Sequence, residues 1–537
     1  MGPDLKPINN SGARVTRGRP GVAAGRERSG RFRRLSLTGR VVVVCGVGLM
    51  VLAVFFAEEN WRGGYAWDRC RQNLESRGVE LNWRNFAPPA VPDEDNFAKT
   101  PFLAPLFDFN PVPLRPGQTR WRDAAGHERA TKFAAELSAG DDSQNSVSLG
   151  LNGRLIDLGA ALQTLRPNTG AVTNASRTEL AKMVLLAMED YQPVLEELRA
   201  ASSRRYCRFG IEYEARDPLG ILLPHLAVLR NVGKALHVRA AAELADGRSG
   251  AALADTKLIF YLVDSIQGEP LLISFLVRRQ MLKMASQIIW EGLSQRSWSE
   301  AELTELEERL SRLNLVNDLR RGLEAERAGF GSAIFSFVRG HKDVLRSWIG
   351  SGDGRGLGYL LAGPNGWFYQ EQVSYQTLYD TRVLSGIDFG RGTFRPGTIQ
   401  ENQKALEKEF EHYVWHHTAF SRLLLPNLSN LLLKAAANQT LMAEAKVACA
   451  LERYRMSKKA YPTGLDGLAM GTVSSDPCTG GALKYQLTSP DQFTLYGVGW
   501  NEKDDGGSVA AASGTADNDS NEGDWVWPRY AAEGSAN

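Results

Sequence analysis

The only cluster of histidines in the sequence, His412, His416 and His417, is the first feature whose residue types and spacing could support chemistry. His412 and His416 are four residues apart, and on a helix their rings would lie on one face, at the spacing of a zinc pair. Glu409 is the nearest candidate for a third ligand. Zinc proteases of the H-E-x-x-H type carry Glu directly after the first histidine, where this chain has Tyr413. We therefore expect a half-exposed helix face here, with metal binding as the alternative.

Other motifs of known chemistry are missing from the sequence. There is no G-x-S-x-G elbow, no P-loop, no dinucleotide-binding fingerprint and no set of kinase motifs. The segment 365–369, Asn-Gly-Trp-Phe-Tyr, lies beside a glycine-rich stretch and could line a cleft, although such aromatic residues more often pack in a core. The cysteines are widely scattered and fit two disulfides as well as free thiols. The sequence assigns no catalytic residue and favours a protein that is not an enzyme.

The first 40 residues are strongly basic. They contain ten Lys and Arg and two acidic residues, a net charge of +8, whereas the whole chain of 537 residues has a net charge of +2. Gly, Pro, Asn and Ser separate the charges, so we expect 1–40 to be a disordered cytoplasmic tail. The balanced total, with 63 basic and 61 acidic residues, excludes a polybasic nucleic-acid-binding protein.

An uninterrupted apolar run, 41–57, follows the tail. Its 17 residues are at the short end for a membrane-spanning helix. A cleavable signal peptide is the alternative, but it needs small residues in an A-x-A-like cleavage site, and this run ends Phe55-Phe56-Ala57. We therefore expect an uncleaved transmembrane anchor. Because Lys and Arg stay on the cytoplasmic side, the prediction is a single-pass protein of the bacterial inner membrane with its N-terminus in the cytoplasm and its bulk in the periplasm.

Two parts are expected between the anchor and the C-terminal region. Residues 58–120 are rich in Pro and aromatic residues, which predicts an extended arm on the surface of the next domain, because each proline removes a backbone donor. From 121 to 426 the apolar residues recur at helical spacing, which predicts an irregular multi-helix domain. Two local signals support this: Ser299 and Glu302 form a capping box, and a turn at 246–250 separates two Ala-rich helical segments.

The C-terminal region, 427–528, has a different pattern. An Ala- and Leu-rich segment predicts a helix over about 427–456, and the alternating runs 483–487 and 493–498 predict a β-hairpin. The prediction is a small α+β module, a long helix with an antiparallel β-meander, followed by a disordered tail, 529–537. The fold class expected for the whole chain is mostly α, with a single transmembrane helix, the irregular helical domain and this module.

The order of features in this region resembles the globular domain of the major pseudopilins of type II secretion. The resemblance covers about the last 90 residues and is carried by Tyr461-Pro462, Leu465, Leu468, Asp476-Pro477, Tyr485, Gly499, Asp504-Asp505, Asp517-Asn518-Asp519 and Trp525. More than 350 residues separate the anchor from the module, whereas a pseudopilin helix emerges directly from its own membrane segment. The resemblance therefore implies a fold for the module, and not assembly into a pseudopilus. The whole chain is also similar to uncharacterised membrane-anchored extracytoplasmic proteins of planctomycete and verrucomicrobial type, which implies no known activity.

The pseudopilin resemblance also implies a calcium site. In pseudopilins the Asp-rich loop binds calcium, and the residues that match this loop here are Asp504, Asp505, Asp517, Asp519 and Asp524. Calcium takes roughly six to eight oxygen ligands from carboxylates, carbonyls and water, which a flexible acidic loop can supply. We expect such an ion to hold the last loop against the meander. The alternative is a solvated acidic segment without an ion.

Together these features predict a single-pass, membrane-anchored extracytoplasmic protein that acts as a non-enzymatic binding or scaffold protein of the bacterial envelope. Its expected partners are the membrane and an envelope protein or polymer, and no nucleic acid. One alternative is an envelope hydrolase or lyase with a cleft near 363–369 and the histidines at 412–417. A second alternative is an accessory component of a type II secretion-like system.

Overall fold

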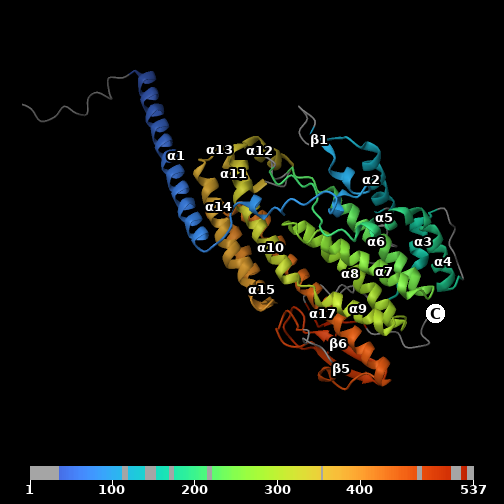
Figure 1. Ribbon diagram of the computed structural model, residues 1–537. Helices are drawn as coiled ribbons and strands as arrows, with labels where there is room; N and C mark the ends of the chain where they lie inside the picture. Colours follow the sequence, from blue (N-terminus) through green and yellow to red (C-terminus); the bar gives the residue numbers. More distant parts are fainter. Residues whose placement is uncertain are drawn as a thin grey trace, which may run out of the picture. The chain divides into compact units, whose positions relative to one another are not determined.

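The computed structural model describes residues 36–111, 119–138, 153–167, 175–214, 220–351, 355–468, 475–508 and 522–528. The chain divides into two compact units, Met1–Glu58 and Glu59–Asn537. The described residues are mostly α-helical, and three small antiparallel sheets complete them (Figure 1). This confirms the expected fold class. The expected tail 529–537, and the expected tail 1–40 as far as residue 35, lie outside the described residues.

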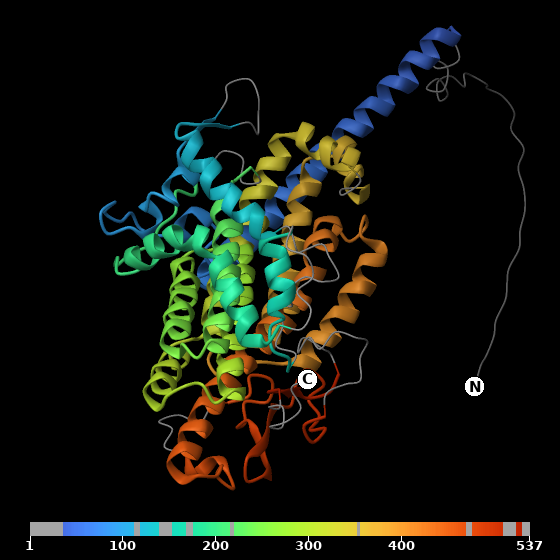
Figure 2. The same ribbon diagram turned by 90° about the vertical axis from the view of Figure 1, so that its right-hand side faces the viewer.

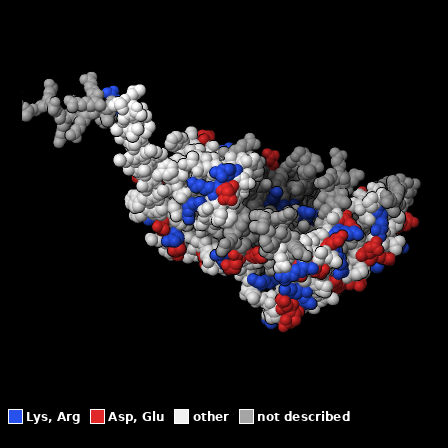
Figure 3. All heavy atoms as spheres, turned by 90° about the horizontal axis from the view of Figure 1, so that it is seen from above, with Lys and Arg blue, Asp and Glu red and all other residues white. Residues whose placement is uncertain are grey.

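Helix α1 (Leu37–Ser76) contains the apolar segment and begins in the first unit. Its apolar side chains before Glu58 are exposed, for example 67% of Leu49 and 64% of Val54. Among the described helices, α1 alone is long and apolar enough to cross a membrane. Figure 3 draws this segment almost entirely in white, that is, without charged side chains. The helix expected for 41–57 is therefore present, and it begins at Leu37.

Residues 58–76 do not form the extended arm expected for 58–120, because they continue α1. The first proline after the apolar run is Pro88, so no proline interrupts the helix before that point. The rest of this stretch is made of short turns and one β-pair. These elements are η2 (Trp83–Phe86), η3 (Phe97–Lys99), η4 (Ala104–Phe107), β1 (Phe109–Pro111) and β2 (Thr119–Trp121). Phe97 and Leu106 are fully buried, so this stretch contributes to the core of the domain.

Long helices form the centre of the second unit (Figure 1). They are α6 (Pro224–Ala245), α7 (Ser249–Ser265), α8 (Leu272–Ser294), α9 (Glu300–Ser311), α10 (Leu315–Ala328) and α17 (Pro426–Lys458). Helix α6 packs against α7 and α8, and α17 packs against α8, α9 and α10. The expected helical hairpin is confirmed in α6 and α7. The expected capping box is also confirmed, because Ser299 and Glu302 exchange side-chain and backbone hydrogen bonds at the start of α9.

Further helices surround this centre. Those before α6 are α2 (Ala124–Ser138), α3 (Leu158–Leu165), α4 (Arg177–Ala187), η5 (Glu189–Tyr191) and α5 (Gln192–Ala201). Those between α10 and α17 are η6 (Gly329–Ile334), α11 (Phe335–Gly340), α12 (Lys342–Ser351), η7 (Arg355–Leu357), α13 (Tyr359–Ala362), α14 (Gly366–Leu378), η8 (Tyr379–Val383), η9 (Leu384–Gly386), α15 (Pro396–Glu409), η10 (Phe410–His412) and α16 (Ala419–Leu424). Strands β3 (Ile387–Asp388) and β4 (Thr393–Phe394) pair between η9 and α15. The segments η6 and η8 are π-helical, a rare form that often occurs at functional sites.

The C-terminal sheet lies beside α17 in both ribbon views (Figures 1 and 2). Its strands β5 (Lys484–Ser489), β6 (Gln492–Gly497) and β7 (Trp525–Val526) are antiparallel in the order β5-β6-β7. The short turn η11 (Leu465–Gly467) connects α17 to the sheet region. The helix and the meander expected for 427–528 are therefore present. Because α17 also packs in the helical centre, the same helix contributes to both parts of the domain.

In the second unit, α1 and α14 cross at two glycines. A Cβ atom added to Gly63 would lie 2.2 Å from the carbonyl oxygen of Gly366, and one added to Gly366 would lie 1.9 Å from the carbonyl oxygen of Glu59. The two backbones are therefore in direct contact. Farther along α1, Trp67 and Leu74 are buried in a small apolar cluster that includes side chains of α14.

We expect Gly63→Ala to destabilise the domain by about 2–3 kcal/mol, because its methyl group has no room beside the α14 backbone. The matched control is Gly64→Ala, since a Cβ at Gly64 meets nothing within 4 Å and alanine stabilises a helix relative to glycine by up to about 1 kcal/mol. Thermal unfolding of the full-length protein in detergent, followed by circular dichroism, measures both changes. Equal melting temperatures for the two variants would contradict the close crossing.

Candidate functional site

Helix α14 carries several polar side chains that are almost completely buried. Glu371 is 0% exposed, and Gln372 and Gln376 are each 1% exposed. Acidic and amide side chains are rarely buried to this extent unless they are hydrogen-bonded. The sequence pattern pointed to the aromatic residues at 365–369, and it carries no local signal for these three polar residues. The polar groups of α14 and their partners form the candidate functional site.

Side chains at the N-terminal end of α14 donate hydrogen bonds to the carboxylate of Glu59 on α1. Trp367 Nε1 donates a hydrogen bond to Glu59 Oε2 at 3.0 Å, and Gln370 Nε2 donates to the same oxygen at 3.2 Å. Arg62 Nη2 lies 2.5 Å from Glu59 Oε1 and forms an ion pair with it. Asn60 Oδ1 accepts the backbone N–H of Gly366 at 2.7 Å. Glu59, the first residue of the second unit, is thus buried with hydrogen-bond donors around its carboxylate. A buried charge requires such partners.

Glu371 joins α14 to the start of α16. Its two carboxylate oxygens accept the backbone N–H groups of Ala419 at 3.0 Å and Phe420 at 2.9 Å, and the hydroxyl of Tyr359 also donates to it. Burial raises the pKa of Glu371 to about 7, although these three donors act in the opposite direction. The carboxylate caps a helix N-terminus, where negative charge is stabilised.

The histidine cluster lies beyond the end of α15, in η10 and the turn after it, and the rings of His412 and His416 are 5.9 Å apart. Helix α15 ends at Glu409, and His416 lies in the turn that follows η10, with Nδ1 3.2 Å from Glu409 Oε1. His417 has φ of 51° and its ring lies 6.0 Å from that of Trp367. Burial lowers the pKa of His417. The structure therefore brings one histidine to the aromatic segment at 365–369. Among the described residues, no group of three or more His, Cys, Asp or Glu is arranged to hold a metal ion.

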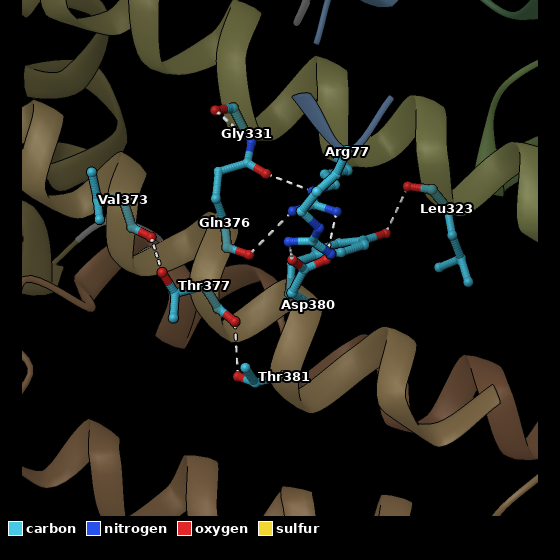
Figure 4. Close-up of polar contacts among 10 residues, drawn as sticks. Arg77, Leu323, Gly331, Val373, Gln376, Thr377, Asp380 and Thr381 are labelled. Atoms are coloured by element: carbon cyan, nitrogen blue, oxygen red, sulfur yellow. Dashed lines mark hydrogen bonds and ion pairs between the residues drawn. The ribbon is translucent and has the colours of Figure 1, made fainter. Parts of the chain in front are cut away.

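At the C-terminal end of α14, Asp380 in η8 forms an ion pair with Arg77, the residue that follows α1 (Figure 4). Arg77 Nη1 lies 2.6 Å from Asp380 Oδ2, and Arg327 Nη1 lies 2.7 Å from Asp380 Oδ1. Burial alone would raise the pKa of Asp380, but the hydrogen bonds from the two arginines outweigh it and lower the pKa. Arg327 Nε also donates to Gln376 Oε1 at 2.6 Å. The Asp380 carboxylate thus connects the residue that follows α1, helix α10 and the π-helical segment η8.

The two π-helical segments meet around the same network. The carbonyl oxygen of Gly331 in η6 accepts hydrogen bonds from Gln372 Nε2 at 2.8 Å and Gln376 Nε2 at 3.1 Å. A Cβ atom at Gly331 would lie 2.2 Å from Gln376 Nε2, so glycine is needed for this approach. In neighbouring α10, burial raises the pKa of Glu326 to about 7. We call the whole set of contacts that fasten α1 to α14, from Glu59 to Arg77, the α1–α14 clamp.

The two buried cysteines, Cys449 and Cys478, offer no reactive nucleophile. All five cysteines are unpaired, so the alternative of two disulfides is not formed. Cys449 and Cys478 are buried, and burial raises the pKa of both thiols. A thiol reacts through its thiolate form, which is disfavoured at these two positions.

The acidic loop after β6 folds around Asp524. Asp524 accepts the backbone N–H of Asp505 at 3.2 Å and that of Gly507 at 2.7 Å, and it is only 2% exposed. Asp504 accepts the hydroxyl of Tyr496 at 2.9 Å and lies 3.4 Å from Lys484 Nζ. Of the five residues that the resemblance assigns to calcium, Asp504 and Asp505 therefore lie in the turn after β6, and Asp524, just before β7, is hydrogen-bonded to that turn. The other two, Asp517 and Asp519, lie outside the described residues, and the calcium site stays a prediction.

No protein-family model, no curated protein and no solved structure matches this chain.

We expect the stability of the protein to fall as the pH rises through about 7, partly because of Glu371. Its pKa in the folded protein is about 7, above the ordinary value of about 4.3. The stability that the protonated Glu371 contributes is therefore fully present below about pH 4.3, and it is lost as the pH rises through about 7 and the carboxyl ionises in the folded protein. A shift of this size corresponds to at most about 4 kcal/mol. Glu371→Gln should therefore weaken the pH dependence between pH 5 and 8, measured by chemical unfolding.

Glu411→Gln is the control for this measurement, because Glu411 is exposed. It should leave the pH profile unchanged. Glu326 titrates in the same range, so the profile of Glu371→Gln should be flattened and not abolished. An unchanged slope in that variant would show that Glu371 does not titrate with a raised pKa.

For the acidic loop, we expect calcium to raise the melting temperature of the full-length protein in detergent by a few degrees, because an ion that binds only the folded state stabilises it. Asp505→Asn should reduce this increase. The control is Asp466→Asn, which removes one acidic side chain in η11, outside the acidic loop. Calorimetric titration with calcium gives the affinity directly. If neither heat nor a shift in melting temperature is observed, the acidic loop is a solvated segment.

Proposed function

We propose that this protein is a single-pass membrane protein of the bacterial envelope whose helical domain acts as a non-enzymatic binding or scaffold protein at the periplasmic face of the inner membrane. The observation that carries the proposal is the double role of α1. Its residues before Glu59 form a mostly exposed apolar helix, and from Glu59 onward one face of it, with Glu59, Gly63, Trp67 and Leu74, is buried in the domain. One continuous helix, Leu37–Ser76, thus contains both segments.

The direction of insertion is proposed from charge. Ten Lys and Arg precede the apolar segment, and short basic flanks remain in the cytoplasm. The surface of the domain carries both signs of charge interspersed, on the face that Figure 3 shows. This pattern suits a protein or polymer partner of the envelope better than a polyanion such as a nucleic acid.

The hydrogen bonding of two carboxylates, Glu371 on α14 and Asp380 just after it, supports binding over catalysis. Both oxygens of Glu371 accept backbone N–H groups, and both oxygens of Asp380 are paired with arginines. Carboxylates that are engaged in this way hold structure together and are poorly placed to take a proton from a substrate.

A hydrolase or lyase remains the second candidate because of one observation. Glu371, with a pKa of about 7, lies in hydrogen-bonding contact with Tyr359, whose ring is 6.5 Å from that of His417. A general base needs a pKa near the working pH. In this alternative Glu371 would be that base. The third candidate, an accessory component of a type II secretion-like system, is supported by the arrangement of α17 and the β5–β7 sheet.

The membrane proposal predicts that the full-length protein stays in the membrane pellet after alkaline carbonate extraction, and that protease added to spheroplasts digests the domain. The double variant Val47→Lys/Leu52→Lys should release it, because each lysine costs about 3 kcal/mol at the centre of a membrane helix and both side chains are exposed. Release of the wild-type protein with an N-terminus near Glu58 would show that the segment is a cleaved signal.

The binding proposal is tested by crosslinking the same full-length protein in cells and identifying the captured partners by mass spectrometry. Recovery of a defined envelope protein or polymer from wild type, and not from the Val47→Lys/Leu52→Lys variant, is the expected result. Capture of pseudopilus subunits would favour the secretion role. Turnover of an envelope polymer that Glu371→Gln abolishes without loss of folding would favour the enzyme.

A further inference from the structure

We propose that the turn 413–417 forms a second contact with the membrane, in which the indole of Trp415 enters the lipid headgroup layer of the bilayer that α1 crosses. The inference rests on the proposed membrane anchoring of α1. It adds an interaction surface on the domain itself and a partner of defined chemistry, the lipid headgroup region.

The exposure of Trp415 is the first observation. Its side chain is 84% exposed, the highest value among the large apolar residues that the structure describes, and Trp61 on α1 is 70% exposed. Tryptophan is usually well buried in soluble domains. At membrane surfaces it is enriched, because its ring is apolar while its N–H can remain hydrated.

The position of the turn is the second observation. His417, two residues after Trp415, lies with its ring 6.0 Å from that of Trp367. Trp367 Nε1 in turn donates to Glu59 at 3.0 Å. Glu59 follows Ala57, the last residue of the apolar run, by two residues, which is about 3 Å along a helix. With the lengths of the side chains included, these steps place the turn within roughly 30 Å of the end of the apolar run.

The turn is held in place by several hydrogen bonds, so the exposed indole is presented by an ordered loop. The backbone N–H groups of Trp415 and His416 both donate to the carbonyl oxygen of His412 at 3.0 Å. The hydroxyl of Ser374 on α14 donates to the carbonyl oxygen of His416 at 3.1 Å. The turn is thus attached to the same helix that holds α1.

The neighbouring side chains match a lipid surface. Arg422 is exposed and its guanidinium lies 4.9 Å from the centre of the Tyr413 ring, and Leu423 beside it is 39% exposed. An arginine next to exposed aromatic and aliphatic side chains can bind lipid phosphate while the apolar groups enter the interface.

Two aromatic residues of α1 would occupy the same layer. Trp61 and Tyr65 are one helical turn apart, their rings stack at 5.9 Å, and both are more than half exposed. They follow the apolar run directly and lie on the opposite face of α1 from Glu59 and Gly63, which pack on α14. The two described tryptophans with the highest exposure are therefore Trp415, in the turn attached to α14, and Trp61, on the helix that α14 contacts.

The experiment places the photoreactive residue p-benzoylphenylalanine at single positions of the full-length protein in nanodiscs of phosphatidylcholine and phosphatidylglycerol. The positions are Trp415, Trp61 as the positive control, and Leu186 on α4 as the negative control. Leu186 is 64% exposed, and α4 lies far from α14 in Figure 1. After irradiation, lipid adducts are measured by intact-protein mass spectrometry.

We expect lipid adducts at 415 and 61 at least tenfold above those at 186. Adducts at 61 without adducts at 415 would overturn this proposal and leave the anchoring intact. The absence of adducts at both 61 and 415 would overturn the anchoring as well. Adducts at 415 only with protein would show that the turn is a protein interface. Since Trp415 is exposed, Trp415→Asp should leave the melting temperature in detergent unchanged, and in nanodiscs it should increase hydrogen exchange in 413–417 relative to wild type.

Discussion

The contact between Gly63 on α1 and Gly366 on α14 is the constraint on which the rest of this arrangement depends. Because neither residue has a side chain, the two helix backbones touch, and polar groups on both sides of the crossing come within hydrogen-bonding distance. On one side Glu59 is held by donors of α14, and on the other Arg77 meets the Asp380 carboxylate. A methyl group at either glycine would separate the helices and lengthen both sets of hydrogen bonds together.

Two buried charges near this crossing, Glu59 and Arg327, require that all of their hydrogen-bond partners be in place. Removing one partner of a buried ion pair leaves the other charge without compensation, which costs more than the pair contributes to stability. Asp380 has two arginine partners, and Arg327 is further fixed by Gln376. The π-helical turn at Gly331 supplies the carbonyl that the two glutamines of α14 require. The groups thus depend on one another, and the region is expected to be rigid.

The features that the sequence predicted well are those that neighbouring residues determine. The capping box at Ser299, the hairpin of α6 and α7, and the alternating strands β5 and β6 each have a local signal. The clamp has none, because Trp367 and its acceptor Glu59 are 308 residues apart in the chain and the burial of Glu371 follows from tertiary packing. The α-helix expected at His412 and His416 is not formed, because α15 ends at Glu409, although both histidines are exposed and their rings lie 5.9 Å apart. The expectation of an extended conformation was wrong for 58–76, which belong to α1. It rested on prolines, and the first of these is Pro88.

The place of α17 in the helical centre has a consequence for biosynthesis. This helix begins at Pro426 and packs against α8, α9 and α10, which are all made earlier. At roughly 5–20 residues per second, the apolar faces of those helices are synthesised on the order of ten seconds before their partner is complete. During that interval the nascent chain would expose them. A chaperone that covers apolar helices, or slow release of the C-terminus from the ribosome, would then govern the yield of the folded protein.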